Sequence, residues 1–140
     1  FSDGEITDTT FKNMGNDGVD VSGSKVIVKN VRIINAGDKG FSVGEGSDVK
    51  LVGSTLAENR IGLAVKDGSF AEVTNSNFTD NEVALVSFQK KSEYSGGKIA
   101  VWRTALKSRK SNWIVEESSQ LFIDGKAISA EAKNVKNLLY

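Results

Sequence analysis

The sequence predicts an all-β fold, a single-stranded right-handed parallel β-helix (solenoid) of about five to six coils, from three observations. Short segments that begin at Gly18, Gly40, Gly62 and Ala84 recur with a constant period of about 22 residues. Apolar and polar residues alternate within these segments, which is the period of a β-strand. Turns rich in Gly, Asn, Asp and Ser separate the strands without helical periodicity between them, which argues against βαβ units and helical repeats.

Each repeat carries three short strands, and equivalent residues of successive repeats fall into apolar columns. The Gly-led strand gives the columns Val19, Phe41, Leu63, Leu85 and Val21, Val43, Val65. The other two strands give Ile6, Val28, Leu51, Val73 and Phe11, Ile33, Leu56, Phe78. Parallel coils place like residues about 4.8 Å apart along the axis, so these columns predict one rod-shaped core.

Asparagines recur in the turns with the same period. Asn13 and Asn35 are separated by one full repeat, as are Asn59 and Asn81. The spacing predicts ladders in which side-chain amides bond to each other and to the turn backbone. The alternative is that asparagine simply tolerates turn conformations.

The repeat resembles that of the pectate-lyase-like superfamily of right-handed parallel β-helices, whose pattern is Gly-apolar-x-apolar, then apolar-x-apolar, then Asn-x-apolar. The resemblance covers residues 6–101 and is specific for the fold rather than for a function. Runs at 37–45, 62–69 and 89–94 resemble β-helix segments of large bacterial surface proteins, some of which carry spore-coat-kinase-like or polysaccharide-processing domains. The resemblance implies an extracellular or cell-surface location and an association with carbohydrate.

The regular repeat ends after Val86. Ser87 stands where an apolar residue is expected, and an insertion at 89–97 predicts a protruding loop before strand-like alternation resumes up to residue 101. Residues 102–129 predict one or two irregular coils, with strands at 113–115 and 121–123, the latter ending at an Asp-Gly turn. Residues 130–140 take a helical period, which predicts a short C-terminal capping helix.

We therefore expect one β-helix domain over residues 1–140 that forms part of a longer protein. Residues 1–6 offer no cap, so an upstream coil or domain, or a second copy, is expected to cover that end. The apolar residues Phe1 and Tyr140 at the two ends favour end-to-end self-association as one alternative.

Composition excludes several kinds of chemistry. The 18 basic and 18 acidic residues cancel, and the chain has neither Cys nor His. Disulfides, thiolate nucleophiles, Cys-ligated zinc and imidazole catalysis are therefore excluded. No apolar run is long enough for membrane insertion, and no signal peptide begins the chain. The short basic run at 107–110 lacks interleaved aromatic residues, so we expect no nucleic-acid partner. The partner that the family resemblance implies is a polysaccharide.

Charged residues gather at outward positions of the Gly-led strands and of the turn that follows them. Glu45 and Asp67 should be neighbours on successive coils, beside Lys66. In β-helix lyases and epimerases, acidic clusters bind calcium and a Lys or Arg removes the sugar C5 proton. The resemblance therefore implies Lys66 as a candidate catalytic base and Glu45 with Asp67 as candidate calcium ligands. The alternative is that these charges only solvate the surface and pair with one another.

The candidate substrate-binding residues combine charge with aromatic rings, because sugar sites commonly stack a sugar ring on an exposed aromatic side chain. They are Asp20, Lys39, Phe88, Lys90, Lys91, Tyr94 and Trp102. The alternative for Trp102 is packing under the loop or against the terminal segment, and Phe88 has the alternative of being covered by the loop.

Three functions follow. The first is a non-catalytic β-helix module of a surface or secreted protein that recognises or rigidly displays glycan. The second is a lyase or epimerase acting on acidic polysaccharides through Lys66, and the third is a structural solenoid that stacks end to end.

Overall fold

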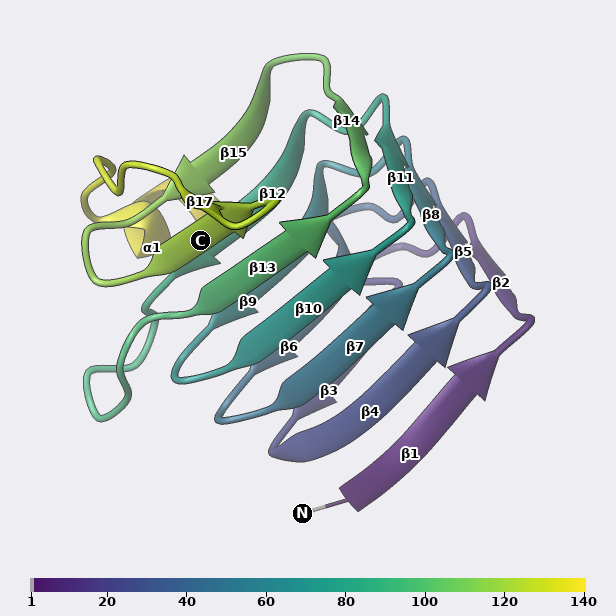
Figure 1. Cartoon of the computed structure of the whole chain (residues 1–140), viewed down its shortest axis with the longest axis horizontal. Helices are drawn as coiled ribbons and strands as arrows, with labels where there is room; N and C mark the ends of the chain where they lie inside the picture. The colour runs from purple at the N-terminus through teal and green to yellow at the C-terminus, as the bar shows by residue number, and fades with distance from the viewer. Residues whose placement is uncertain (1) are drawn as a thin grey trace.

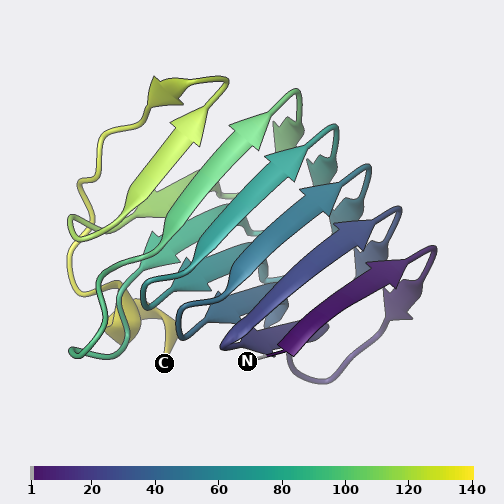
Figure 2. The same cartoon turned by 60° about the horizontal axis from the view of Figure 1, so that its bottom comes forward.

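The computed structural model describes residues 2–140 and confirms the parallel β-helix (Figures 1 and 2). Sheet A contains β1 (Ser2–Thr7), β4 (Ser24–Lys29), β7 (Asp48–Val52), β10 (Phe70–Thr74), β13 (Lys98–Trp102), β16 (Gln120–Ile123) and β17 (Lys126–Ala127). Sheet B contains β2 (Thr10–Lys12), β5 (Arg32–Ile34), β8 (Thr55–Ala57), β11 (Asn77–Thr79) and β14 (Ala105–Lys107). Sheet C contains β3 (Val19–Ser22), β6 (Lys39–Gly44), β9 (Ile61–Lys66), β12 (Val83–Phe88) and β15 (Ser111–Val115).

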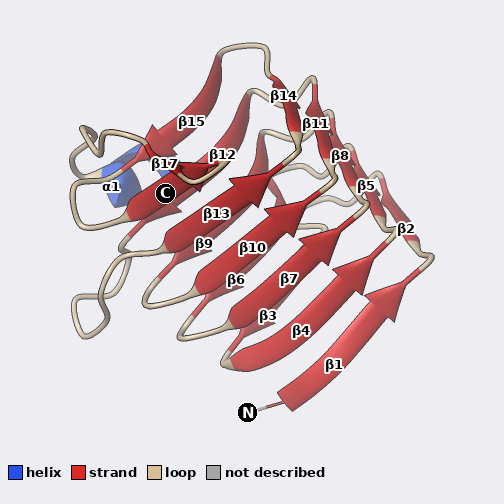
Figure 3. Ribbon diagram, in the orientation of Figure 1, coloured by secondary structure: helices blue, strands red, loops and turns tan. Residues whose placement is uncertain are grey.

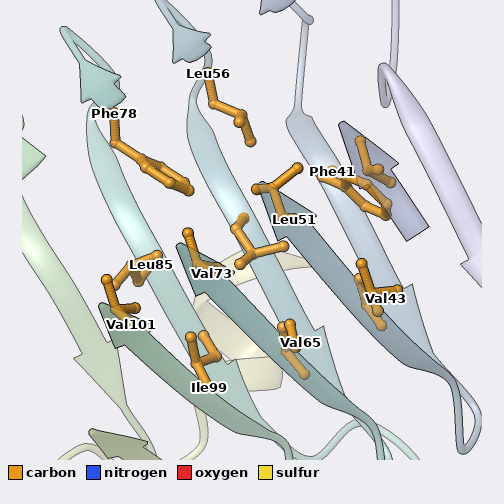
Figure 4. Packing of buried hydrophobic residues seen from close by; sticks show 14 of the residues in the cluster. Phe41, Val43, Leu51, Leu56, Val65, Val73, Phe78, Leu85, Ile99 and Val101 are labelled. Atoms are coloured by element: carbon orange, nitrogen blue, oxygen red, sulfur yellow. The ribbon is translucent and has the colours of Figure 1, made fainter. Parts of the chain in front are cut away.

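Strand pairing confirms the predicted columns. All neighbouring strands are parallel except β17, which pairs antiparallel with β16. The Asp-Gly turn between them was predicted, but the hairpin was not. In sheet C, Val19 pairs with Phe41 and Val43 pairs with Val65. In sheet A, Leu51 pairs with Val28 on one side and with Val73 on the other. Their side chains fill one continuous buried core between the three sheets (Figure 4).

Hydrogen-bonded ladders of polar side chains run along the turns. Asn35 Nδ2 donates to Asn13 Oδ1 at 2.9 Å, and Asn59 Nδ2 donates to Asn81 Oδ1 at 3.0 Å. The predicted asparagine ladders are therefore confirmed. A serine ladder was not predicted: the backbone N–H of Ser47 donates to Ser69 Oγ at 3.0 Å, and similar bonds run through Ser54 and Ser76.

Ser87 takes its expected inward position, where it pairs with Val65 and Val115. Its hydroxyl is buried and has no hydrogen-bond partner among the described residues. The loop at 89–97 follows immediately and protrudes from the coil, as the broken repeat predicted (Figure 1).

The two ends of the rod differ. In the described chain, β1, β2 and β3 each form the last strand of a sheet, so that end presents unpaired strand edges. At the opposite end, β14 and β15 are likewise the last strands of sheets B and C, but in sheet A β17 pairs with β16, and Ile128 and Ala130 pack against the core. The predicted role of Phe1 in stacking lies outside the described residues.

The C-terminal helix exists but is shorter than expected and occupies a different place. Helix α1 spans only Val135–Leu139 (Figure 3). Instead of capping the end of the core, it lies on the outer face of sheet C, where the fully buried Val135 packs in a cluster with Ile61, Val86 and Phe88. Among the described residues, no helix has the length and apolar character needed to cross a membrane.

Candidate functional site: a lysine cluster on the outer face of sheet C

Several predicted site residues meet around the side chain of Tyr140. The Nζ atoms of Lys90, Lys39 and Lys66 lie 4.0, 4.5 and 5.7 Å from the centre of the Tyr140 ring. Lys66 Nζ also donates a hydrogen bond to the Tyr140 hydroxyl at 3.2 Å. We call Lys39, Lys66, Lys90 and Tyr140 the lysine cluster. Because Tyr140 is 54% exposed, ligands in solution can reach the cluster.

The β-helix register explains this convergence. Lys39 begins β6, Lys66 ends β9, and Lys90 follows shortly after β12, so successive coils deliver one lysine each. Gly44 helps to place Lys66, because a Cβ atom at Gly44 would lie 2.9 Å from Lys66 Cε. The glycine therefore leaves the space through which the Lys66 side chain runs.

Lys39 is only 2% exposed, and its charge is balanced by Asp38. Lys39 Nζ donates to Asp38 Oδ2 at 3.0 Å, and Arg60 donates to the same carboxylate. Burial alone would lower the pKa of Lys39, but the hydrogen bonds and charge interactions with Asp38 and Tyr140 together outweigh it and the pKa is raised. Burial alone would raise the pKa of Asp38, but its hydrogen bonds to Lys39 and Arg60 outweigh it and the pKa is lowered.

Lys66 and Lys90 carry the excess positive charge of the cluster. Within the described part of the chain, neither ammonium lies within 4.0 Å of a carboxylate oxygen. Their neighbours are instead the Tyr140 ring and hydroxyl. Two of the three lysines therefore have no carboxylate partner, which favours an anionic ligand.

Glu45 and Asp67 stack on successive coils as predicted. The backbone hydrogen bond from Gly46 N–H to the Asp67 carbonyl, at 2.9 Å, shows that the two turns are in register. The Glu45 side chain pairs with Lys91 at 3.0 Å, and this contact lowers the pKa of Glu45. Asp67 is fully buried, and its Oδ1 accepts the backbone N–H groups of Lys90 and Lys91, both at 2.8 Å.

Glu45 and Asp67, which directly follow β6 and β9, are the two carboxylates that could hold a cation here. Asp67 Oδ2 is buried without a hydrogen-bond partner among the described residues. However, residues 2–140 contain no group of three or more acidic, His or Cys side chains arranged to hold a metal ion. Calcium binding by Glu45 and Asp67 stays a prediction.

The remaining predicted residues lie elsewhere or are covered. Asp20 is exposed on β3, whereas the later members of its outward column are buried. Phe88 faces outward, as its register requires, but it is fully buried, with its ring centre 6.4 Å from that of Tyr140. Tyr94 packs near Gly68 on the loop, and Trp102 faces outward from sheet A with 40% exposure.

The sequence did not predict that residues 131–140, which we call the C-terminal arm, form part of the site. Several hydrogen bonds attach the arm. Ala132 N–H donates to the Val115 carbonyl at 3.0 Å, and the Ala132 carbonyl accepts the Glu117 N–H at 3.0 Å. Val135 N–H donates to Glu116 Oε2 at 2.9 Å, Arg60 donates to the Leu139 carbonyl at 3.3 Å, and Lys66 donates to the Tyr140 hydroxyl at 3.2 Å. The signal was present, because the outward column of sheet C contains Ala64 and Val86, and an apolar outer face requires a cover.

A family model described as "Right handed beta helix region" matches residues 1–101. The match covers well over half of the chain, and it ends where the regular coils end. The chain therefore belongs to the right-handed β-helix family. No curated protein and no solved structure matches it.

Proposed function

We propose that this protein is a non-catalytic β-helix module that binds an acidic polysaccharide through the lysine cluster, as part of a cell-surface or secreted protein. The observation that carries the proposal is the pair of ammonium groups, Lys66 and Lys90, beside an exposed tyrosine without a carboxylate partner among the described residues. The location follows from the resemblance of the repeats to bacterial surface proteins.

An acidic polysaccharide suits this arrangement because it repeats negative groups along an extended chain. Lysine ammonium groups are compact charges that pair with carboxylates or sulfates without demanding one fixed geometry. Lys66 and Lys90 come from successive coils and converge on the same ring, so the sheet holds two ammonium groups in a fixed arrangement. This fixed arrangement lowers the entropic cost of binding a repeating polyanion.

Calorimetric titration with a galacturonic acid hexamer at low and high salt tests the proposal. The double variant Lys66→Gln/Lys90→Gln should bind about tenfold or more weakly, since two charge-assisted contacts are lost. The matched control is Lys12→Gln/Lys107→Gln, which removes the same charge from exposed positions on sheet B. Equal affinity of the first variant and wild type, or an equal loss in the control, would overturn the proposal.

One contact favours a second candidate, a polysaccharide lyase or epimerase. The Lys66 amine and the Tyr140 phenol are hydrogen-bonded at 3.2 Å, and these are two groups able to remove and return a proton. A lyase should then convert the same hexamer to an unsaturated product that absorbs ultraviolet light, whereas an epimerase should exchange the sugar C5 proton for deuterium in heavy water without any absorbance change. Lys66→Gln should abolish either activity. Absence of both signals with and without calcium favours the binding module.

A further inference from the structure

The outer face of sheet A carries three aromatic side chains on its last coils. Phe70 lies on β10, Trp102 on β13 and Phe122 on β16, all at outward positions of the pleat. Trp102 is 40% exposed, and both phenylalanines are partly exposed. None of the three belongs to the core clusters, so the fold does not explain their place on this face.

The ammonium group of Lys98 lies close to two of these rings. Its Nζ lies 5.2 Å from the centre of the Phe70 ring and 5.5 Å from that of Phe122. The side chain is exposed, and no carboxylate of the described chain lies within 4.0 Å of its ammonium. The ammonium is therefore held by cation–π contacts and keeps its charge for a ligand.

The earlier coils of the same face differ. There, oppositely charged residues occupy register-paired positions: Lys25 lies between Asp3 and Asp48, and Lys50 pairs with Glu72. Charge is balanced along these rows as far as Glu72, which shares β10 with Phe70. On the next coil the cation beside the aromatic rings is Lys98, and we call the part of the face from β10 to β16 the aromatic half. The aromatic half is thus complementary to a ligand with a negative group and an apolar face.

The surface around Lys98 is shaped for an extended ligand. Ala100 occupies the outward position between Lys98 and Trp102. Its side chain is small, so the outer surface of β13 is recessed between its two larger neighbours. A groove whose lining includes Phe70, Ser95, Lys98, Glu117, Ser119 and Gln120 opens beside it, between the loop and the last coil. Figure 2 shows the long strands of sheet A side by side, with no other described segment in front of them.

We infer that Phe70, Lys98, Trp102 and Phe122 form a second contact surface for an acidic glycan. The rings stack on the apolar C–H faces of the sugars, and Lys98 pairs with a sugar carboxylate. Phe70 and Phe122 are two coils apart, about 10 Å along the axis, so the occupant is an oligosaccharide lying across the strands. The class of ligand rests on the proposed function, whereas the surface itself is separate from the lysine cluster.

The fluorescence of Trp102 tests this surface directly. A Trp113→Phe variant leaves Trp102 as the only tryptophan, and it is titrated with galacturonic acid hexamer and with a neutral glucose hexamer. We expect a saturable change in Trp102 emission with the acidic hexamer only. Adding Lys98→Gln should weaken its binding about five- to thirtyfold. Lys25→Gln, at an exposed position in the same row, is the matched control and should leave the affinity unchanged.

The outcomes separate the two surfaces. If Lys66→Gln/Lys90→Gln leaves the affinity unchanged while Lys98→Gln lowers it, the lysine-cluster proposal fails and this inference stands. If Trp102 emission does not respond, if the neutral hexamer binds equally well, or if Lys98→Gln and Lys25→Gln behave alike, the inference is overturned. Because Lys98 is exposed, its replacement leaves the core intact, and an unchanged thermal unfolding midpoint verifies this.

Discussion

The fully buried carboxylate of Asp67 accepts the backbone N–H of Lys90 at 2.8 Å, across one coil of the helix. The same oxygen accepts the N–H of Lys91. Asp67 therefore fixes the first residues of the loop, and with them the backbone that carries one ammonium of the lysine cluster.

Replacing Asp67 should release this loop. Asp67→Ala should lower the free energy of unfolding by about 1–3 kcal/mol, because two backbone donors lose their acceptor. Asp67→Asn keeps one carbonyl oxygen and should cost less. Denaturant titration measures the stability, and hydrogen exchange at the amides of Lys90 and Lys91 should accelerate in the alanine variant alone. Unchanged exchange there would contradict the role assigned to this carboxylate.

Anchoring of the C-terminal arm depends on Val135. Val135→Asp should detach the arm and expose the outer face of sheet C, because a charge cannot be buried there without a partner. We expect a lower unfolding midpoint and increased binding of an apolar dye. Leu138→Asp is the matched control on the same helix, since Leu138 is 66% exposed and should tolerate the charge. Equal behaviour of the two variants would argue against the observed packing of α1.

The Asp38–Lys39–Arg60 network should give a defined acid dependence of stability. The pKa of Asp38 is lowered on folding, so its contribution is present above its unfolded value of 3.8 and is lost as the pH falls further, through the folded pKa. The pKa of Lys39 is raised, so its contribution is present below 10.5 and is lost as the pH rises through the folded pKa.

Asp38→Asn should therefore reduce the dependence of the unfolding midpoint on pH below 3.8, relative to wild type. Thermal unfolding between acid and neutral pH measures it. If the unfolding midpoint of the variant falls as steeply as that of wild type on acidification, other carboxylates govern the loss of stability in acid.

The buried asparagine ladder should be more important for stability than the exposed one. Asn81 accepts two hydrogen bonds from Asn59 and donates one to the Leu56 carbonyl, all out of contact with water. Asn81→Ala should cost about 3 kcal/mol, because these groups lose their partners. Asn13 is exposed with φ 56°, so Asn13→Gly keeps the backbone conformation and should cost under about 1 kcal/mol. Urea titration compares the two.

The repeating part of the fold was predictable because each coil obeys the same two constraints. Phe41, Val43 and Leu51 must point inward, and each must also align with its equivalent on the neighbouring coil. Both conditions are met only when the repeat length stays nearly constant. The serine ladder is equally regular, with Ser47 and Ser69 separated by one repeat, but serine is common in turns, so its spacing alone does not indicate a ladder.

The arrangement outside the coils was less predictable. A helical period at 130–140 indicates an apolar face but not the surface on which it packs, so the meeting of Tyr140 with Lys39, Lys66 and Lys90 required the structure. On sheet A, the inserted loop makes the spacing between Phe70 and its register partner Lys98 longer than the regular repeat. This break concealed the pairing of Phe70 with Lys98 and the proximity of Phe122, which lies one row away as the partner of Ala100, so that sequence reasoning identified only Trp102.

The difference between the two ends gives the rod a direction of growth. A further coil placed before β1, β2 and β3 would find a free hydrogen-bonding edge in every sheet. At the other end, β14 and β15 leave free edges in sheets B and C, whereas in sheet A the antiparallel strand β17 covers the edge of β16. A coil added there could pair along two sheets but not along the third, so the described rod is extended in all three sheets only from the side of β1, β2 and β3.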